Sequence, residues 1–442
     1  MTPEFRRLVA VDFQRHRLAA LGVALVGTFG VGYLADDRGF DTTTAFFAGI
    51  GYFALVFLWG TRQAAECVIQ EINARTWDAQ RMSSLSAWGM AWSKFAGATA
   101  FTWAGGAVCL AFYAAAHFGE WGPYQTLLRV FLYVVSGFFG QAVCFLIGLS
   151  VIQRRRQFGR VQVASYQFMG LLAALPPLYA GLSLTGGESI LDLIIWYGRY
   201  ITFAQFTIAT MAVFSLWTLV GAWALMRAEL QEPVGPWVWI AFTLFAMAYF
   251  AGIKNFPVGP SLQLAKITVP NMPTLTLGVG LAIAFTAAYV EPKDRLRLAQ
   301  LERDLAFGRW RAAAVLFPRS AIALVLATLG AIVALVIDGA ASRQLPGLAT
   351  GLAAMALFAV RDIAFIYWLC LGRIDGRGEG MAAAVLAVGY VPLPMLLGLI
   401  GFGPLLAAFL PVPDAPPWLT VALPVIEAAL MLWLLGRRWR RL

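Results

Sequence analysis

The sequence predicts an all-α polytopic membrane protein. Of the 442 residues, 60% are hydrophobic and 13% are charged, and the mean hydropathy is +0.73. A soluble domain has about 45–50% apolar residues and about a quarter charged residues. The apolar runs are long and continuous, which fits transmembrane helices rather than the short alternating strands of a β-barrel. The composition therefore excludes a soluble, a disordered or a disulfide-framed protein.

Uncharged stretches of about 18 residues or more predict about twelve transmembrane helices. They cover residues 18–35, 43–60, 95–116, 130–152, 161–185, 200–226, 236–253, 273–290, 320–337, 345–372, a segment within 381–413, and 417–436. The charged opening segment leads into the first of them without a small-residue cleavage site, so we expect no cleaved signal peptide.

Basic residues are distributed unevenly between the two sides of the predicted membrane. Of the 33 Lys and Arg, 26 lie in connections on the side of the N-terminus, 6 lie on the opposite side, and Arg361 lies within a span. Cytoplasmic connections carry such an excess of basic residues. We therefore expect a multi-pass protein of a bacterial cytoplasmic (inner) membrane, with both termini in the cytoplasm.

The chain divides into two halves of six spans, residues 1–232 and 233–442. In each half a charged connection follows the second span, at residues 61–94 and 291–319. Because six is an even number, the halves run in the same direction and form a parallel repeat.

An apolar outer segment separates the fifth and sixth spans of each half, at residues 186–199 and 401–417. The uncharged run 381–413 would extend about 50 Å as a helix, whereas the hydrocarbon core is about 30 Å thick. We expect a break and a re-entrant outer segment here. The alternative is one tilted helix with a kink at its proline pair, Pro392 and Pro394.

Residues 2–13 predict an amphipathic helix along the inner membrane interface. Thr2 is a good N-cap, Pro3 suits the first helical position, and Glu4 complements the positive end of the helix dipole. Apolar side chains recur on one face. The alternative is a basic flank that only sets the orientation.

The connection 61–94 predicts a short polar helix to about Met82, a turn at Ser83–Ser84, and a new helix capped by Ser86. This stretch resembles the coupling-helix region of type-2 ATP-binding-cassette (ABC) exporter permeases, Glu-x-x-x-Gly-Thr-x-Glu-x-Leu-x-x-x-Pro-Leu-Ser-x-x-x-Ile-x-x-Gly-Lys. The matching positions are Glu71, Thr76, Asp78 in place of the second acid, Leu85-Ser86 and Ser93-Lys94. The chain departs from the pattern at Arg75, where Gly is usual, at Ser84, where Pro is usual, and at Arg81.

The resemblance implies the membrane-spanning subunit of an ABC exporter, with an interfacial N-terminal helix and a re-entrant segment before each sixth span. A polar helix between two spans would seat on a soluble ATPase, with Glu71, Asp78 and Arg81 at the rim of the contact and Trp77 as a buried anchor. No Gly-x-x-x-x-Gly-Lys-[Ser/Thr] loop occurs, so we expect ATP hydrolysis in a separate partner subunit, itself a dimer, and no enzyme activity in this chain. With two distant histidines and four scattered cysteines, we expect no metal and no cofactor.

The second charged connection does not spell the same pattern. Its residues Leu298, Leu301 and Leu305 fall on one helical face, beside Glu302, and offer the same coupling role in the second half. The alternative for both connections is an amphipathic helix that rests on the membrane surface.

Three charged residues lie inside predicted spans, where charge is costly and marks functional candidates. Arg361 and Asp362 are adjacent, so their side chains point about 100° apart and we expect them to address different neighbours. We expect Glu427 to pair with Arg361 between two helices. The pair either holds the second half together or lines a translocation path.

Two other functions compete with the ABC permease. Residues 32–39 (GYLADDRG) look like a loop motif of major-facilitator transporters, which favours a secondary transporter, but they lie on the wrong side of the membrane for that family. An intramembrane lipid-modifying enzyme lacks a visible catalytic group. The partners expected are the lipid bilayer, the ATPase and a small-molecule or lipid-like substrate, and no nucleic acid.

Overall fold

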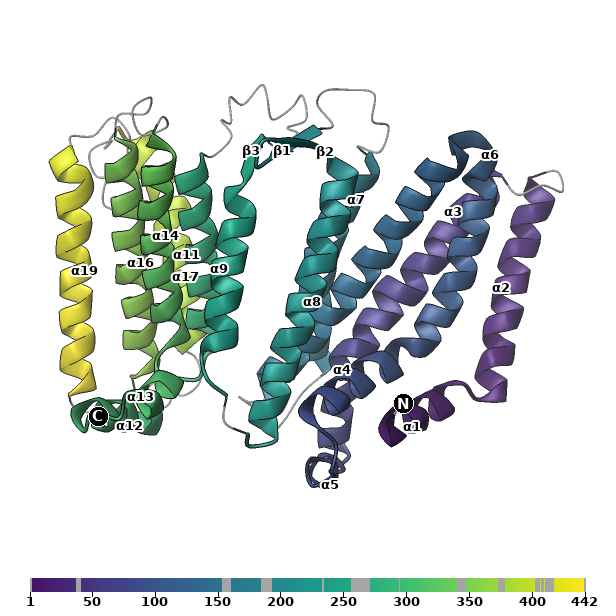
Figure 1. Ribbon diagram of the computed structural model, residues 1–442, viewed down its shortest axis with the longest axis horizontal. Coiled ribbons are helices and arrows are strands. Elements are labelled where there is room, and N and C mark those ends of the chain that lie inside the picture. The colour runs from purple at the N-terminus through teal and green to yellow at the C-terminus, as the bar shows by residue number, and fades with distance from the viewer. Residues whose placement is uncertain are drawn as a thin grey trace. The chain divides into compact units, whose positions relative to one another are not determined.

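The computed structural model of the chain (Figure 1) describes residues 2–36, 41–152, 160–183, 193–232, 234–255, 271–293, 295–339, 347–372, 378–401, 406, 409 and 417–440. Within these residues, nine helices are long and apolar enough to cross a membrane. The protein is thus an all-α polytopic membrane protein, as its composition predicted.

The chain forms two compact units, Met1–Ile194 with Tyr200–Val234, and Ile195–Arg199 with Gly235–Leu442. The described helices of unit 1 are α1 (Pro3–Asp12), α2 (Arg15–Ala35), α3 (Thr42–Tyr52), the π-helix η1 (Phe53–Gly60), α4 (Thr61–Asn73), α5 (Trp77–Arg81), α6 (Ala87–Ile152), α7 (Arg160–Ser183) and α8 (Phe203–Glu229). Those of unit 2 are α9 (Trp237–Ala251), α11 (Met272–Val290), α12 (Arg295–Ala306), α13 (Trp310–Leu316), α14 (Arg319–Ile337), α16 (Leu348–Cys370), α17 (Gly378–Tyr390), α18 (Pro392–Leu399) and α19 (Pro417–Trp439).

Helix α1 begins as the sequence predicts. The side chain of Thr2 accepts a hydrogen bond from the amide of Phe5, and Pro3 stands at the first helical position. Helix α6 is likewise capped by Ser86, whose side chain accepts from the amide of Gly89.

Helices α3, η1 and α4 follow one another without interruption for 32 residues, about 48 Å of helix. The π-helical turns leave carbonyl groups without their usual intrahelical partner, and in a membrane these need another donor. The amide side chains of Gln141 and Gln167 donate to the carbonyls of Val56 (3.0 Å) and Leu58 (2.7 Å). Two side-chain amides, one of them buried, thus hold the π-helix in place.

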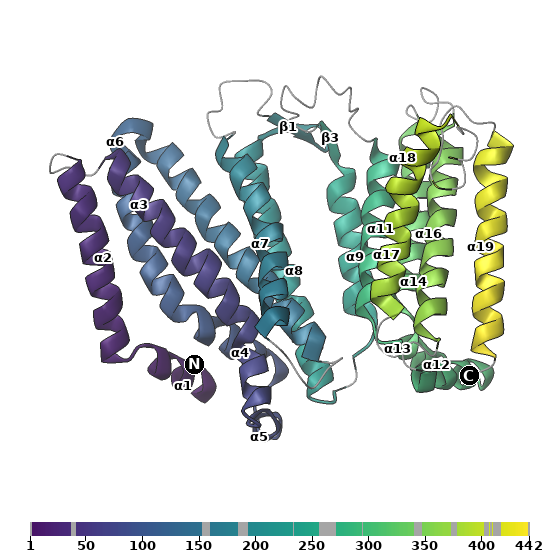
Figure 2. The same cartoon turned by 180° about the vertical axis from the view of Figure 1, so that it is seen from behind.

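The 66-residue α6 is two helices joined by a tight turn, visible at one end of unit 1 in Figure 2. Gly122 has φ +74°, which glycine adopts freely, and Pro123 follows it. The turn falls between the predicted spans 95–116 and 130–152, so the two arms of α6 correspond to these spans.

The outer segment at 186–199 is not helical where the structure describes it. Strands β1 (Leu193–Trp196) and β2 (Arg199–Thr202) form a hairpin whose turn residues, Tyr197 and Gly198, both have positive φ. β1 pairs with β3 (Ile253–Asn255) on its other edge. Residues 193–199 therefore belong to a β-hairpin, and the re-entrant placement of this outer segment stays a prediction. Residues 184–192, and nearly all of 401–417, lie outside the described part of the chain.

The uncharged run after residue 381 bends at its proline pair, as the alternative of one kinked helix predicts, and Gly378–Leu399 is long and apolar enough to cross a membrane as one span. The re-entrant segment stays a prediction. Helix α17 ends at Tyr390, Val391 has φ −113° and ψ −76°, and α18 starts at Pro392. Proline lacks an amide hydrogen and disfavours helical geometry in the residue before it, so the chain bends at this point.

Candidate functional site

The turn between α4 and α6 projects beyond the end of α4, with α5 at its tip (Figure 1). Arg75 leaves α4 in the left-handed conformation, with φ +58°. The amide and hydroxyl of Thr76 then both donate to the carbonyl of Glu71, at 3.0 and 3.2 Å, and close the helix end. The tip presents Asp78 and Met82 to solvent, each with 88% of its surface exposed, while the Arg81 guanidinium lies 3.7 Å from Asp78.

Trp77 is placed differently from the prediction. Its side chain is buried in the core of unit 1, against a cluster that includes Ile72, Leu85 and Leu230. The tryptophan therefore anchors α5 to its own unit, and it is not an exposed anchor for a partner. A five-residue helix has too little periodicity to show from sequence which face is buried.

At the base of this turn, the fully buried Lys94 joins three elements. Its ammonium donates to Glu4 of α1 at 2.5 Å and to Glu71 of α4. Arg7 of α1 donates to the same two carboxylates, at 2.6 Å to Glu4 and 2.9 Å to Glu71. The first and last residues of the coupling-like pattern, Glu71 and Lys94, are thus in direct contact.

Charge neutralisation explains why these groups tolerate burial. Burial alone would raise the pKa of the Glu4 carboxyl, but hydrogen bonds from Arg7 and Lys94 outweigh this effect and lower it below 4.5. The hydrogen bond to Glu4 raises the pKa of Arg7. Two cations and two carboxylates therefore form a neutral cluster that ties α1 to α4 and α6.

Two further contacts fix α1 against the start of α6. The hydroxyls of Thr2 and Ser93 lie 2.5 Å apart, and Leu8 packs on Gly97, where an added Cβ would lie 2.8 Å from the leucine. Sequence reasoning missed Glu4 and Arg7 as members of the site. Their signal is an acid and a base three residues apart on a predicted interfacial helix. The sequence around them does not indicate their distant partners, Glu71 and Lys94.

The second connection forms a helical hairpin, α12 and α13, joined by a turn at Gly308. Leu298 and Leu301 are buried within unit 2, whereas Leu305 is partly exposed. Leu301, which we expected to contact a partner, thus packs inside its own unit. The exposed Glu302 accepts a hydrogen bond from the indole of Trp439 at 3.2 Å, so it contacts α19.

A buried carboxylate also closes this second connection. Glu291, at the end of α11, accepts from the amide of Arg319 at 2.8 Å and from the hydroxyl of Ser320 at 2.6 Å. The hydroxyl of Tyr367 donates to it as well. In both units, an acid that follows the second predicted span of the half thus binds the start of the third.

Arg361, Asp362 and Glu427 meet in one network inside unit 2. The Arg361 guanidinium donates to Glu427 at 2.5 Å, so the expected pair is present. It also donates to Asp362 at 2.8 Å and to the hydroxyl of Tyr390 at 3.0 Å, and that hydroxyl donates to Asp362. The expectation that Arg361 and Asp362 address different neighbours is wrong, because the long, flexible arginine side chain folds back onto the next residue.

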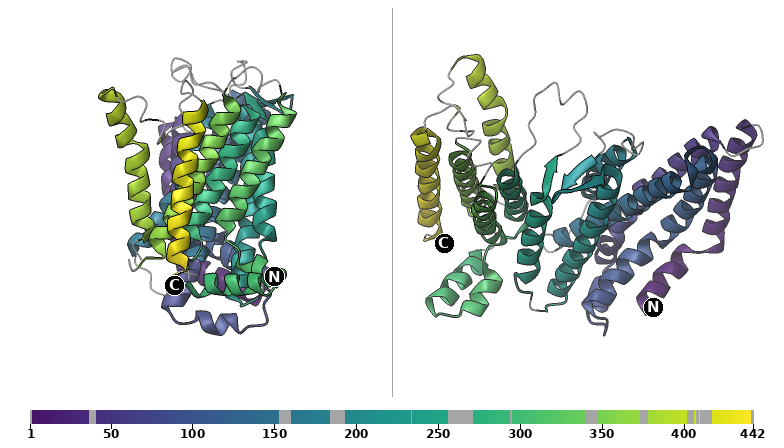
Figure 3. Two further views of the ribbon diagram at one scale, coloured as in Figure 1. Left: turned by 90° about the vertical axis from the view of Figure 1, so that its left-hand side faces the viewer. Right: turned by 45° about the horizontal axis from the view of Figure 1, so that its top comes forward.

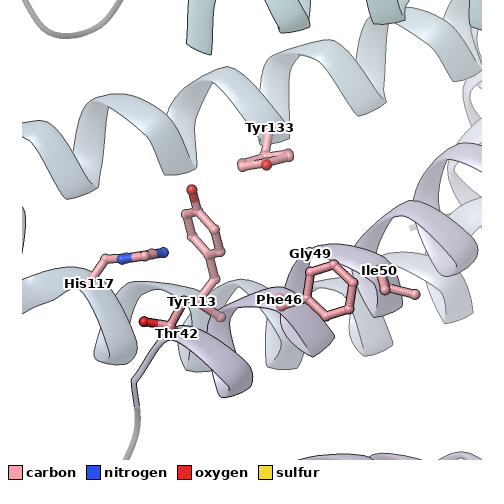
Figure 4. A pocket seen from close by; sticks show the side chains of 8 residues that line it. Thr42, Phe46, Gly49, Ile50, Tyr113, His117 and Tyr133 are labelled. Carbon is pink, nitrogen blue, oxygen red and sulfur yellow. The ribbon is translucent and has the colours of Figure 1, made fainter. Parts of the chain in front are cut away.

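A shallow pocket of about 380 Å³ lies between α3 and the two arms of α6 (Figure 4). Its labelled lining is Thr42, Phe46, Gly49 and Ile50 of α3 with Tyr113, His117 and Tyr133 of α6. The indole of Trp121 stacks on His117 at 3.5 Å, and the Arg129 guanidinium covers Trp121 at 3.7 Å. The pocket is thus apolar along α3 and polar towards Tyr113 and His117.

Comparison with known protein families, with curated proteins and with solved structures finds no match.

Proposed function

We propose that this chain is the permease subunit of an ABC exporter. It forms the translocation path for a small hydrophobic or lipid-like molecule and couples to a separate, dimeric ATP-binding subunit. The observation that carries the proposal is the projecting α4–α5–α6 turn, whose base is closed by the contact between Glu71 and Lys94.

The length of the helix that leads to the turn supports a contact in the aqueous phase. The 32 residues from Thr42 to Asn73 extend about 48 Å, against a hydrocarbon core of about 30 Å. The excess carries α5, with the exposed Asp78 and Met82, away from the membrane surface and within reach of a soluble protein.

The backbone of Arg75 supports the resemblance to the coupling region. This residue has φ +58°, a conformation that glycine adopts without strain, and the permease pattern has Gly at this position. A left-handed backbone at this position is one that the glycine of the pattern adopts freely, which supports the resemblance although the residue differs.

The neutral cluster of Lys94, Arg7, Glu4 and Glu71 connects the α4–α5 segment to α1 and α6. A partner that moves α5 displaces α4, and the bonds of Glu71 to Lys94 and Arg7 pass this displacement to α6 and α1. Closure of the ATPase is proposed to change the packing of unit 1 in this way.

The proposal includes twelve crossings in two parallel halves, with both termini in the bacterial cytoplasm. Each of the two arms of α6 makes one crossing, and α7 and α9 make one crossing each. The other long apolar helices supply the remaining crossings.

External labelling of a cysteine at Glu120 or Asp414 should succeed, and labelling at Arg156 should fail. The reverse pattern would contradict the orientation. Asp414 and Arg156 lie outside the described residues.

One observation favours a secondary transporter instead, namely the mid-span network around Arg361. The fragment that resembles the major-facilitator loop gives less support. Asp36 accepts from the amides of Thr43 and Thr44 and so caps α3. Transport that continues after ATP depletion would favour this alternative.

Photo-crosslinking tests the ABC assignment. A photoreactive amino acid replaces Asp78 or Met82 in the full chain in its native membrane, and Tyr124, exposed at the α6 turn, serves as the control. We expect crosslinks to an ATP-binding-cassette protein from positions 78 and 82 and none from 124. Equal crosslinking at all three positions, or none to such a protein, would contradict the proposal.

A further inference from the structure

The connection between α11 and α14 presents a different surface from the α5 tip. We propose that the α12–α13 hairpin lies in the membrane interface and binds anionic lipid headgroups. Each chain then engages an ATP-binding subunit through α5 alone, a consequence that rests on the proposed function.

Short tethers hold this hairpin at the ends of its spans. Helix α11 has 19 residues, about 28 Å, which matches the hydrocarbon core. It ends at Val290, and α12 begins at Arg295. On the other side, α13 ends at Leu316 and α14 begins at Arg319. Connections this short cannot carry the hairpin far from the membrane surface.

Polar contacts fix the hairpin beside those ends. Trp439, at the end of α19, donates to Glu302 of α12 at 3.2 Å, and Lys293, just before α12, forms an ion pair with Glu379 of α17 at 2.7 Å. Figure 3 shows α12 and α13 running across the direction of the spans of unit 2. This is the orientation of an interfacial helix.

The exposed face of the hairpin carries large apolar side chains. Leu296 is 79% exposed, Phe307 is 74% exposed and Trp310 is 70% exposed, whereas Leu298 and Leu301 already form the inner face. A hairpin surrounded by water gains nothing from a second apolar face. Aromatic and leucine side chains of this kind insert into the boundary between headgroups and acyl chains.

The charge of the connection selects the lipid. Residues 291–319 hold seven basic and four acidic residues, a net charge of +3. Glu291 and Asp304 are buried. Glu291 binds the start of α14, and Asp304 is paired with Arg309 at 2.9 Å. Arg303 and Arg311 are exposed. Basic side chains beside inserted aromatic residues complement anionic headgroups.

The exposed face of α12–α13 therefore contacts a lipid surface and not a second ATPase subunit. The α5 tip stands clear of the membrane and offers the acidic Asp78, whereas α12–α13 stays at the membrane boundary and offers aromatic and basic side chains. The two connections therefore differ in surface chemistry, although in each a carboxylate binds the start of the third predicted span of its half.

Depth-dependent fluorescence quenching tests this placement. An environment-sensitive fluorescent amino acid replaces Phe307 or Met82 in the full chain, reconstituted in nanodiscs of phosphatidylcholine and phosphatidylglycerol. We expect lipids spin-labelled near the headgroup to quench position 307 and aqueous iodide to quench position 82. Iodide quenching at 307 as strong as at 82 would overturn the inference.

A charge reversal tests the preference for anionic lipid. Arg303→Glu with Arg311→Glu should lower the amount of phosphatidylglycerol that co-purifies with the protein, and the control Arg81→Glu on α5 should leave it unchanged. Equal lipid content in all three proteins would overturn the headgroup claim. Crosslinks from position 307 to an ATPase would show that α5 is not the single contact with that subunit. If positions 78 and 82 fail to crosslink, the proposed function is overturned, but the lipid contact of α12–α13 is not.

Discussion

Lys94 shows how one buried charge joins three elements of unit 1. A buried ammonium is stable only when it is paired, and here Glu4 and Glu71 pair with it from two other elements. Sequence reasoning found Glu71 and Lys94 through the resemblance to permeases. It did not find that they touch, because a contact across 23 residues depends on how α4 and α6 pack.

Removal of the Lys94 charge should destabilise unit 1 strongly. Lys94→Met leaves two partly buried carboxylates with only Arg7, and we expect a loss of about 3 kcal/mol in the free energy of unfolding. The pair of Arg62 and Glu66 provides the control, because its cation is exposed, and Arg62→Met should cost less than ~1 kcal/mol. Denaturant unfolding in detergent measures both. Equal, small losses would contradict a central role for Lys94.

Docking of α1 should weaken in acid. Because the pKa of Glu4 lies below 4.5 in the docked state, protonation opposes docking. The stabilisation is complete above pH 4.5 and is lost as the pH falls through the lower, docked-state pKa. Hydrogen exchange of the α1 amides should therefore accelerate, relative to other amides, below about pH 4.5. Glu4→Gln should remove this dependence, and its persistence in that variant would assign it to another group.

The Arg361 network should respond to charge as a unit. Glu427→Gln should lower stability, since Arg361 loses one of two carboxylate partners. Arg361→Met with Glu427→Leu should recover little, because Asp362 stays buried with only Tyr390, whereas the further change Asp362→Asn should recover most of the loss. Thermal unfolding measures the series. Unchanged stability together with altered transport would instead favour a role in the translocation path.

Among the elements, the turn after α4 makes a testable claim about backbone conformation. The left-handed region costs a non-glycine residue about 1–2 kcal/mol, and glycine's extra freedom in the unfolded chain costs up to about 1 kcal/mol. Arg75→Gly should therefore raise stability by up to ~1 kcal/mol. Ala74, with φ −78°, is the matched control, and Ala74→Gly should lower stability. Thermal unfolding of both variants decides, and destabilisation by Arg75→Gly would contradict the argument.

Element boundaries were predictable where a local signal exists. Thr2 and Ser86 cap their helices, and Gly122-Pro123 divides α6 between two predicted spans. The π-helix was not predictable, because the side chains that stabilise it, Gln141 and Gln167, come from distant helices. The hairpin turn at Tyr197-Gly198 carried a usable signal, a glycine at the second turn position, which the apolar composition of its surroundings obscured.

At the scale of the whole molecule, composition decided the class of protein and hydropathy located its long helices. Neither could decide the functions of the two charged connections, since both are amphipathic. The two connections differ in which of their side chains stay exposed. Trp77 and Leu301 are both inside their own units, which leaves Asp78 and Met82 exposed in one connection and Phe307 and Trp310 in the other.

The rate of ATP hydrolysis tests the central claim most directly. The chain and the ATP-binding subunit that crosslinks to it are reconstituted together, and hydrolysis is measured for the native chain, for Asp78→Lys and for Arg303→Glu. We predict that the native chain stimulates hydrolysis, that Asp78→Lys lowers this stimulation about tenfold, equivalent to ~1.4 kcal/mol, and that Arg303→Glu retains it. Stimulation that is unaffected by Asp78→Lys but lost with Arg303→Glu would contradict coupling through α5.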